Sequence, residues 1–151
     1  MTRSIDVLAK RILERANAPA IRALRETVPQ VGPQTALTVI AELGDVGRFR
    51  NARRAASYAG LVPRVANSSD TSHHGPITKH GNAELRWILN QLAVRLLTQH
   101  PLVRRWAAPF LRRMHINKVR TVLARRLLVG LYVVLARGEV FSLERCLGVA
   151  A

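Results

Sequence analysis

The clearest structural signal in this chain is the segment Asn82-Ala-Glu-Leu-Arg-Trp-Ile-Leu-Asn-Gln-Leu-Ala-Val-Arg-Leu-Leu-Thr-Gln99. Its aliphatic residues recur every three or four positions, at Leu85, Ile88, Leu89, Leu92 and Leu96. Because one face of an α-helix repeats with this spacing, residues 83–99 are predicted to form a helix that buries this stripe. Asn82 is a residue type that caps helix starts, and Pro101 disfavours the helical conformation at His100, so both ends are marked.

Helical patterns also flank this segment on both sides. Shorter helices are expected upstream, over about 5–17, 21–27, 33–43 and 51–59, and two more downstream, over 102–114 and 118–137. The last of these is expected to expose Arg125 and Arg126 and to bury Val122, Leu127, Leu131 and Leu135. No stretch alternates like a strand. The predicted fold class is therefore all-α, a compact helical domain with a C-terminal helical extension.

A turn between two of the predicted helices, Pro29-Gln-Val-Gly-Pro-Gln-Thr-Ala36, resembles a helix-hairpin-helix element. Pro33 suits the first turn of a helix, where its missing N–H would have no partner. Backbone amides at such a helix start can hold a DNA phosphate without reading sequence, so Gly32, Gln34 and Thr35 are candidate phosphate contacts. An ordinary corner between two helices is the alternative, since Gln30 stands where these hairpins usually have glycine.

The charge of the chain is strongly positive. Twenty-four Lys and Arg against nine Asp and Glu give a formal net charge of +15. No acid lies between Asp45 and Asp70, nor between Glu84 and Glu139. A basic excess of this size attracts polyanions and favours the release of counterions from nucleic acid, which is the expected partner. A solvated surface, or a ribosome or membrane contact, is the alternative. Further candidate contacts are Arg64, His73, His74, Lys79, Asn82 and Arg86.

Other classes of protein are disfavoured by the residue content. The single cysteine, Cys146, excludes an intrachain disulfide and fits a reducing bacterial cytoplasm, where association with the nucleoid is expected. The most apolar run, residues 127–136, is about half as long as a bilayer span, so no membrane partner is expected. The acids are scattered and the histidines lack a partner set, so we expect no metal site and no cofactor in this chain.

Two adjacent serines, Ser68 and Ser69, lie in the polar run of residues 67–72. A serine hydroxyl becomes a nucleophile only when a base takes its proton and cations bind the phosphate that it attacks. Arg64 and Lys79 supply cations, but no clear base is present. From composition alone such a pair belongs to a turn or a cap.

Three ordered motifs carry a resemblance to a known family. They are VPQVGPQTALTVIAELGD at 28–45, FRNARRAASYAGLVP at 49–63 and GPITKHGN at 75–82, the last followed by Leu85 and Arg86. Together with the stretch 118–141, they resemble the C-terminal part of IS110/IS116/IS902-type transposases. The resemblance divides the chain into an N-terminal helix (1–23), the transposase C-terminal domain (24–112) and a basic helix and tail (113–151).

The resemblance implies that a loop serine attacks a DNA phosphodiester in transposition and recombination. Motif spacing places Ser68 at the nucleophile, with Ser69 as the alternative. It also implies Mg²⁺ bound to an N-terminal RuvC-like domain, which we expect to be absent from this chain, and a structured guide RNA. Partners would then be DNA, that domain or further copies of the chain. Ser69 and Asp70 replace the glycines of the family loop, so we expect the chain to be inactive alone.

Two other functions stay open from the sequence. One is a non-catalytic, basic nucleic-acid-binding protein that uses the hairpin and its helices. The other is a helical interaction domain whose charge serves solubility. Whether the chain is an enzyme is therefore undecided from the sequence.

Overall fold

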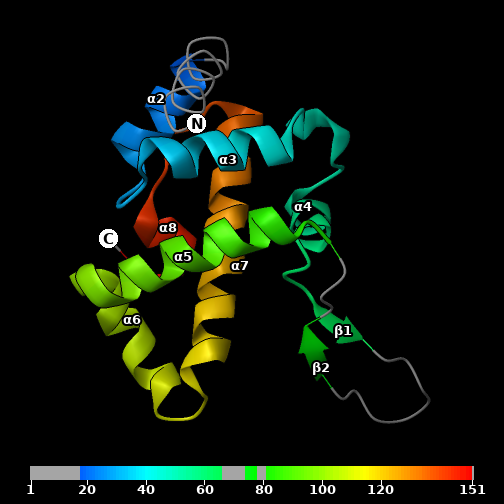
Figure 1. Cartoon of the computed structure of the whole chain (residues 1–151). Helices are drawn as coiled ribbons and strands as arrows, with labels where there is room; N and C mark the ends of the chain where they lie inside the picture. Colours follow the sequence, from blue (N-terminus) through cyan, green and yellow to red (C-terminus); the bar gives the residue numbers. More distant parts are fainter. Residues whose placement is uncertain (1–17, 66–73, 78–80, 151) are drawn as a thin grey trace, which may run out of the picture.

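The computed structural model describes residues 18–65, 74–77 and 81–150 (Figure 1). Its elements are α2 (Ala18–Thr27), α3 (Pro33–Leu43), the short 3₁₀ helix η1 (Val46–Arg48), α4 (Ala52–Tyr58), β1 (Pro63–Val65), β2 (His74–Ile77), α5 (Ala83–Gln99), α6 (Pro101–Leu111), α7 (Ile116–Arg137) and α8 (Leu143–Leu147). The all-α class is confirmed. The helix expected over about 5–17 lies outside the described residues.

Helix α5 has the predicted bounds and the predicted core face. Leu85, Leu89, Leu92 and Leu96 are fully buried, and Ile88 is nearly so. The Asn82 side chain accepts a hydrogen bond from the Leu85 N–H over 2.8 Å, which caps the helix as expected. Local sequence was sufficient here because the apolar stripe and both end signals agree.

Helix α7 lies at the centre of the molecule. It passes behind α5 and contacts α4, α5, α6, α8 and η1 (Figure 1). Its fully buried residues Leu123, Leu127 and Leu128 belong to the same hydrophobic core as α3 and α5. The family resemblance placed residues 113–151 in a segment of their own, after the domain 24–112. In the structure, residues of both segments belong to one hydrophobic core.

The predicted core face of α7 was wrong in part. Leu127 and Leu131 are buried as expected, but Leu135 is half-buried and Val122 is 39% exposed. The buried face instead includes Val119 and Leu123 at its start. Val122 precedes Leu123 by one residue, which turns its side chain about 100° away around the helix, at 3.6 residues per turn.

The arginines of α7 also differ from the prediction, because Arg125 and Arg126 are half-buried. Arg126 Nη1 donates to the Cys146 carbonyl over 3.2 Å, and its guanidinium lies 5.7 Å from the centre of the Trp106 ring. These contacts join α7 to α6 and α8.

A short two-stranded antiparallel ladder was not expected. Pro63 pairs with Ile77, and Val65 pairs with His74. Strands of three and four residues are too short to show alternation, so the sequence pattern contains no signal for them. The ladder joins the two ends of residues 66–73, a segment outside the described residues.

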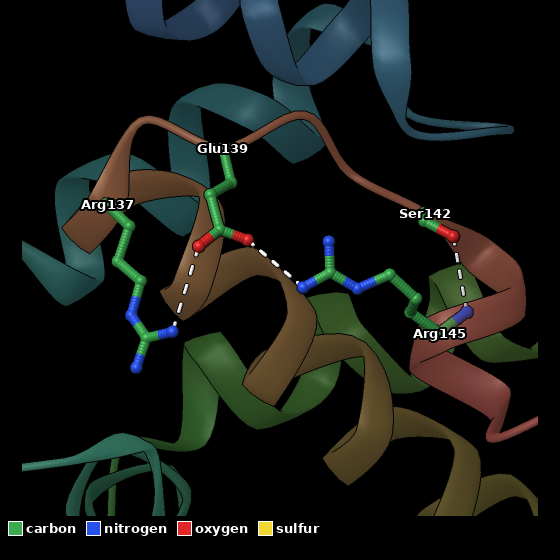
Figure 2. A network of polar contacts seen from close by, with 4 residues as sticks. All are labelled: Arg137, Glu139, Ser142 and Arg145. Atoms are coloured by element: carbon green, nitrogen blue, oxygen red, sulfur yellow. Dashed lines mark hydrogen bonds and ion pairs between the residues drawn. The ribbon is translucent and has the colours of Figure 1, made fainter.

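After α7 ends, the C-terminal segment turns back and α8 packs against α7 (Figure 2). Glu139 lies 3.7 Å from Arg137 Nη1 and 3.1 Å from Arg145 Nη2, and the Ser142 hydroxyl caps α8 by accepting from the Arg145 N–H. Burial raises the pKa of the nearby Cys146 thiol to about 12, so the thiol stays protonated at neutral pH. Within the described ranges, no helix has the length and apolar character needed to cross a bilayer.

Adjacent residues of α7 provide a test of its orientation. Leu123→Ala should lower the free energy of unfolding by about 2–5 kcal/mol, because it empties a filled core position. Val122→Ala should change it by less than about 0.5 kcal/mol, because that side chain faces solvent. Urea unfolding followed by circular dichroism measures both. Equal losses would contradict the orientation of α7 described above.

Candidate nucleic-acid interface

The turn between α2 and α3 has an unusual backbone conformation at Gln30. Its φ of 63° lies in the left-handed region that favours glycine, which agrees with glycine being usual at this place in helix-hairpin-helix turns. Gly32 then precedes α3 and Pro33 begins it. Since the first amides of a helix have no helical partner, those of Gln34 and Thr35 are free to meet an anion. Phosphate binding by this turn stays a prediction.

The side chain of Thr35 is not available for that role. It is buried, and its hydroxyl accepts a hydrogen bond from Arg95 Nη2 over 2.9 Å. Thr35 faces α5, so its hydroxyl joins two helices of the core. The expected nucleic-acid contact is therefore restricted to its backbone amide, whereas the Gln34 side chain is exposed.

Two sequence motifs meet directly at Gly60 and Gly81, which are 21 residues apart in the sequence. The Asn82 N–H donates to the Tyr58 carbonyl over 2.7 Å. Gly81 has φ 127°, and a Cβ added there would lie 2.7 Å from the Tyr58 oxygen and from the Gly60 nitrogen. Only glycine permits this approach of the two backbones. The contact joins the end of α4 to the start of α5, and β1 begins three residues after Gly60.

The side chain of Asn82 completes this contact. Its Nδ2 donates to Glu42 Oε2 on α3 and, over 3.2 Å, to the Tyr58 hydroxyl, while its Oδ1 caps α5. Both of its N–H groups are thus used within the protein. The structure assigns Asn82 to joining α3, α4 and α5, in place of the nucleic-acid contact expected from the sequence.

A basic surface lies beside this contact, on η1 and α4. Arg50, Arg53 and Arg54 are exposed, and Arg86 is anchored by donating from Nη1 to the Ala59 carbonyl over 3.2 Å. The Arg48 guanidinium, followed by the side-chain amide Nδ2 of Asn82, lowers the pKa of the Tyr58 phenol because both stabilise the phenolate. The sequence analysis identified the acid-free run 46–69, but it did not name Arg50, Arg53 or Arg54 as candidate contacts.

Of the remaining predicted residues, only two lie within the described part of the chain. Arg64 lies in strand β1, and His74 lies in strand β2. Ser68, Ser69, His73 and Lys79 lie outside the described residues. Among the residues that are described, no three His, Cys, Asp or Glu side chains converge to hold a metal ion. The donor set of this part of the chain therefore does not fit a divalent cation.

Comparison with known proteins places this helical chain in a family of transposases. Residues 22–108 match the family described as Transposase IS116/IS110/IS902 family, and the chain belongs to that family. It is 31% identical over 121 residues to the transposase for insertion sequence element IS1111A of Coxiella burnetii, covering 77% of this chain and 33% of that protein. It is 34% identical over 120 residues to the transposase for IS1328 of Yersinia enterocolitica, covering 77% and 36%.

This chain also aligns with a relative that is named for a different role. The pilin gene-inverting protein of Moraxella bovis is 37% identical over 73 residues, or 48% of this chain and 23% of that protein. The chain spans about a third of the length of the two transposases above.

The role of Asn82 is tested by two changes of the same kind at two helix caps. Asn82→Asp keeps the cap but removes both donors and sets a second carboxylate beside Glu42, so it should cost about 1–3 kcal/mol of unfolding free energy at neutral pH. Asn51→Asp should cost nothing, because exposed Asn51 only accepts from the Arg54 N–H.

The pH dependence of this loss has a defined sign. Repulsion between the two carboxylates raises the pKa of one of them above its unfolded value, so the Asn82→Asp variant regains stability as the pH falls and one group binds a proton. Unfolding measured between acidic and neutral pH should show the gap from wild type narrowing toward acid. A gap that is constant with pH would contradict contact between residue 82 and Glu42.

Proposed function

We propose that this chain is the DNA-binding C-terminal part of a transposase and acts in DNA transposition and recombination. The proposal rests on one observation, the convergence of the motifs 49–63 and 75–82 at Gly60, Gly81 and Asn82. This contact lies at the end of α4, whose exposed arginines form part of the basic surface. DNA bound along that surface would lie beside this contact, and the serine pair follows β1 in the sequence.

In the proposed chemistry, the Ser68 hydroxyl loses its proton to a base and its oxygen attacks a DNA phosphodiester, with Ser69 as the alternative nucleophile. A bond forms between the serine oxygen and phosphorus, the bond from phosphorus to one sugar oxygen breaks, and that oxygen leaves as a DNA hydroxyl. Arg64 and Lys79 are the proposed cations that stabilise charge developing on the phosphate oxygens. A base is also required to take the serine proton, and the sequence offers no clear one. We therefore propose that a RuvC-like domain with its bound Mg²⁺ supplies the activation, and that this chain alone is inactive. A structured guide RNA and further copies of the chain are the other proposed partners.

The runner-up is a non-catalytic nucleic-acid-binding protein. The observation that favours it is the exposed basic surface of Arg50, Arg53 and Arg54, which attracts a polyanion without needing any chemistry. Both functions require binding to nucleic acid, and only the first requires the serine.

The purified chain should bind duplex DNA tightly at low salt and with little sequence preference. Each phosphate neutralised steepens the slope of log affinity against log salt by about 0.9, so several contacts should give a slope of several units. Fluorescence anisotropy between low and physiological ionic strength measures it. A salt-independent affinity would exclude both nucleic-acid functions and leave the helical interaction domain.

A covalent protein–DNA adduct should form through Ser68 when the chain is supplied with the RuvC-like domain of a close relative. Ser68→Ala should abolish the adduct while DNA binding persists, and Ser69→Ala should only reduce it. Denaturing gel electrophoresis with labelled DNA detects the adduct. Loss with Ser69→Ala instead would move the nucleophile by one residue, and no adduct in any combination would leave the non-catalytic function.

A further inference from the structure

The guanidinium of Arg48 is held in place although the residue is exposed. Nε donates to the Leu43 carbonyl over 3.2 Å, and Nη2 donates to the Glu42 carbonyl over 3.4 Å, at the end of α3. Its carbon atom Cζ also lies 4.5 Å from the Phe49 ring centre and 4.6 Å from that of Tyr58. A guanidinium has five N–H donors, so three remain after these two bonds.

These contacts give Arg48 a property that ordinary surface arginines lack. A free arginine side chain loses rotamer entropy when it is immobilised by a ligand. Much of that cost is already met at Arg48 by the folding of η1 against α3 and α4. Its remaining donors therefore form a pre-organised fork, the geometry that matches a phosphate group.

A pocket of about 520 Å³ opens beside this fork. It is lined by Arg48, Phe49, Arg50, Arg54, Ser57 and Tyr58. Three of the six are arginines and none is an acid, while Ser57 and Tyr58 add hydroxyl groups. Arg50 and Arg54 are exposed and have no side-chain hydrogen bond or ion pair within the described part of the chain.

We propose that this pocket binds a backbone phosphodiester of nucleic acid, with Arg48 as its fixed fork and Arg50 and Arg54 as cations that close on the phosphate. This inference rests on the proposed function and names the place where the backbone is held. Since the pocket lies on α4, which ends at the contact with Gly81, a bound strand is anchored beside the ladder. DNA and RNA share the phosphodiester, and the test separates them.

The test compares two pairs of substitutions that remove the same charge. Arg50→Ala/Arg54→Ala removes two cations of the pocket, and Arg104→Ala/Arg105→Ala removes two exposed arginines of α6. Affinity is measured by anisotropy with a labelled DNA duplex and with an RNA strand of the same sequence, at several salt concentrations. The pocket pair should weaken binding about tenfold or more and flatten the salt slope for DNA by roughly two units, and the α6 pair should do much less.

A single conservative change tests the pre-organised fork separately. Arg48→Lys keeps the charge but loses the two-pronged geometry and the stacking, so it should weaken binding several-fold, whereas Arg54→Lys should retain most of the affinity. Circular dichroism at each salt concentration controls for folding, and Asp45→Asn, which alters η1 without touching the pocket, controls for a shift of that helix.

The outcomes separate the two proposals. If wild type binds in a salt-dependent way but both charge pairs weaken it equally, the pocket is overturned and the proposed function stands. If wild type binds neither DNA nor RNA, both fall. A loss by the pocket pair with DNA alone assigns the pocket to DNA, and a loss with RNA alone assigns it to RNA.

Discussion

The side chain of Asn82 connects three helices through one amide group. Its oxygen caps α5, and its nitrogen donates to Glu42 of α3 and to Tyr58 of α4. The adjacent Gly81 lets the backbone approach Gly60 closely enough for the Asn82 N–H to reach the Tyr58 carbonyl. The β1–β2 ladder begins two residues after Leu61 and ends four residues before Gly81, so both of its strands lie close in sequence to this contact.

Several of the nine acids of this chain have partners within the protein itself. Glu42 accepts from Asn82, Asp45 accepts from the Gly47 N–H, and Glu144 accepts from the Ser142 hydroxyl. Glu139 is shared by Arg137 and Arg145. These carboxylates are used within the protein, whereas Arg50, Arg53 and Arg54 point to solvent. The field near the ladder is therefore dominated by cations, which favours a polyanionic partner.

The candidate site shows which residue roles can be predicted from sequence. The arginine-rich, acid-free run 46–69 indicated a basic surface correctly, because charge is a property of the residues themselves. Thr35 was expected at nucleic acid through its backbone amide at a helix start, and Asn82 was expected there as a residue of a family motif. The structure places both in bonds between helices, with Arg95 and with Glu42, partners 60 and 40 residues away. A polar side chain has no sequence signal that distinguishes an internal partner from an external one.

The helical class could be predicted from the sequence alone, and so could the bounds of α5 and its buried stripe. These features depend on the spacing of apolar residues and on capping residues within one segment. Only the tertiary structure decided which face of α7 is buried, since a long helix in contact with α4, α5, α6 and α8 offers several apolar faces and packing selects among them. The ladder was likewise decided in space, as its two short strands have no pattern of their own. The fixed position of Arg48 has the same origin, because the carbonyls and rings that hold it meet only when η1 folds against α3 and α4.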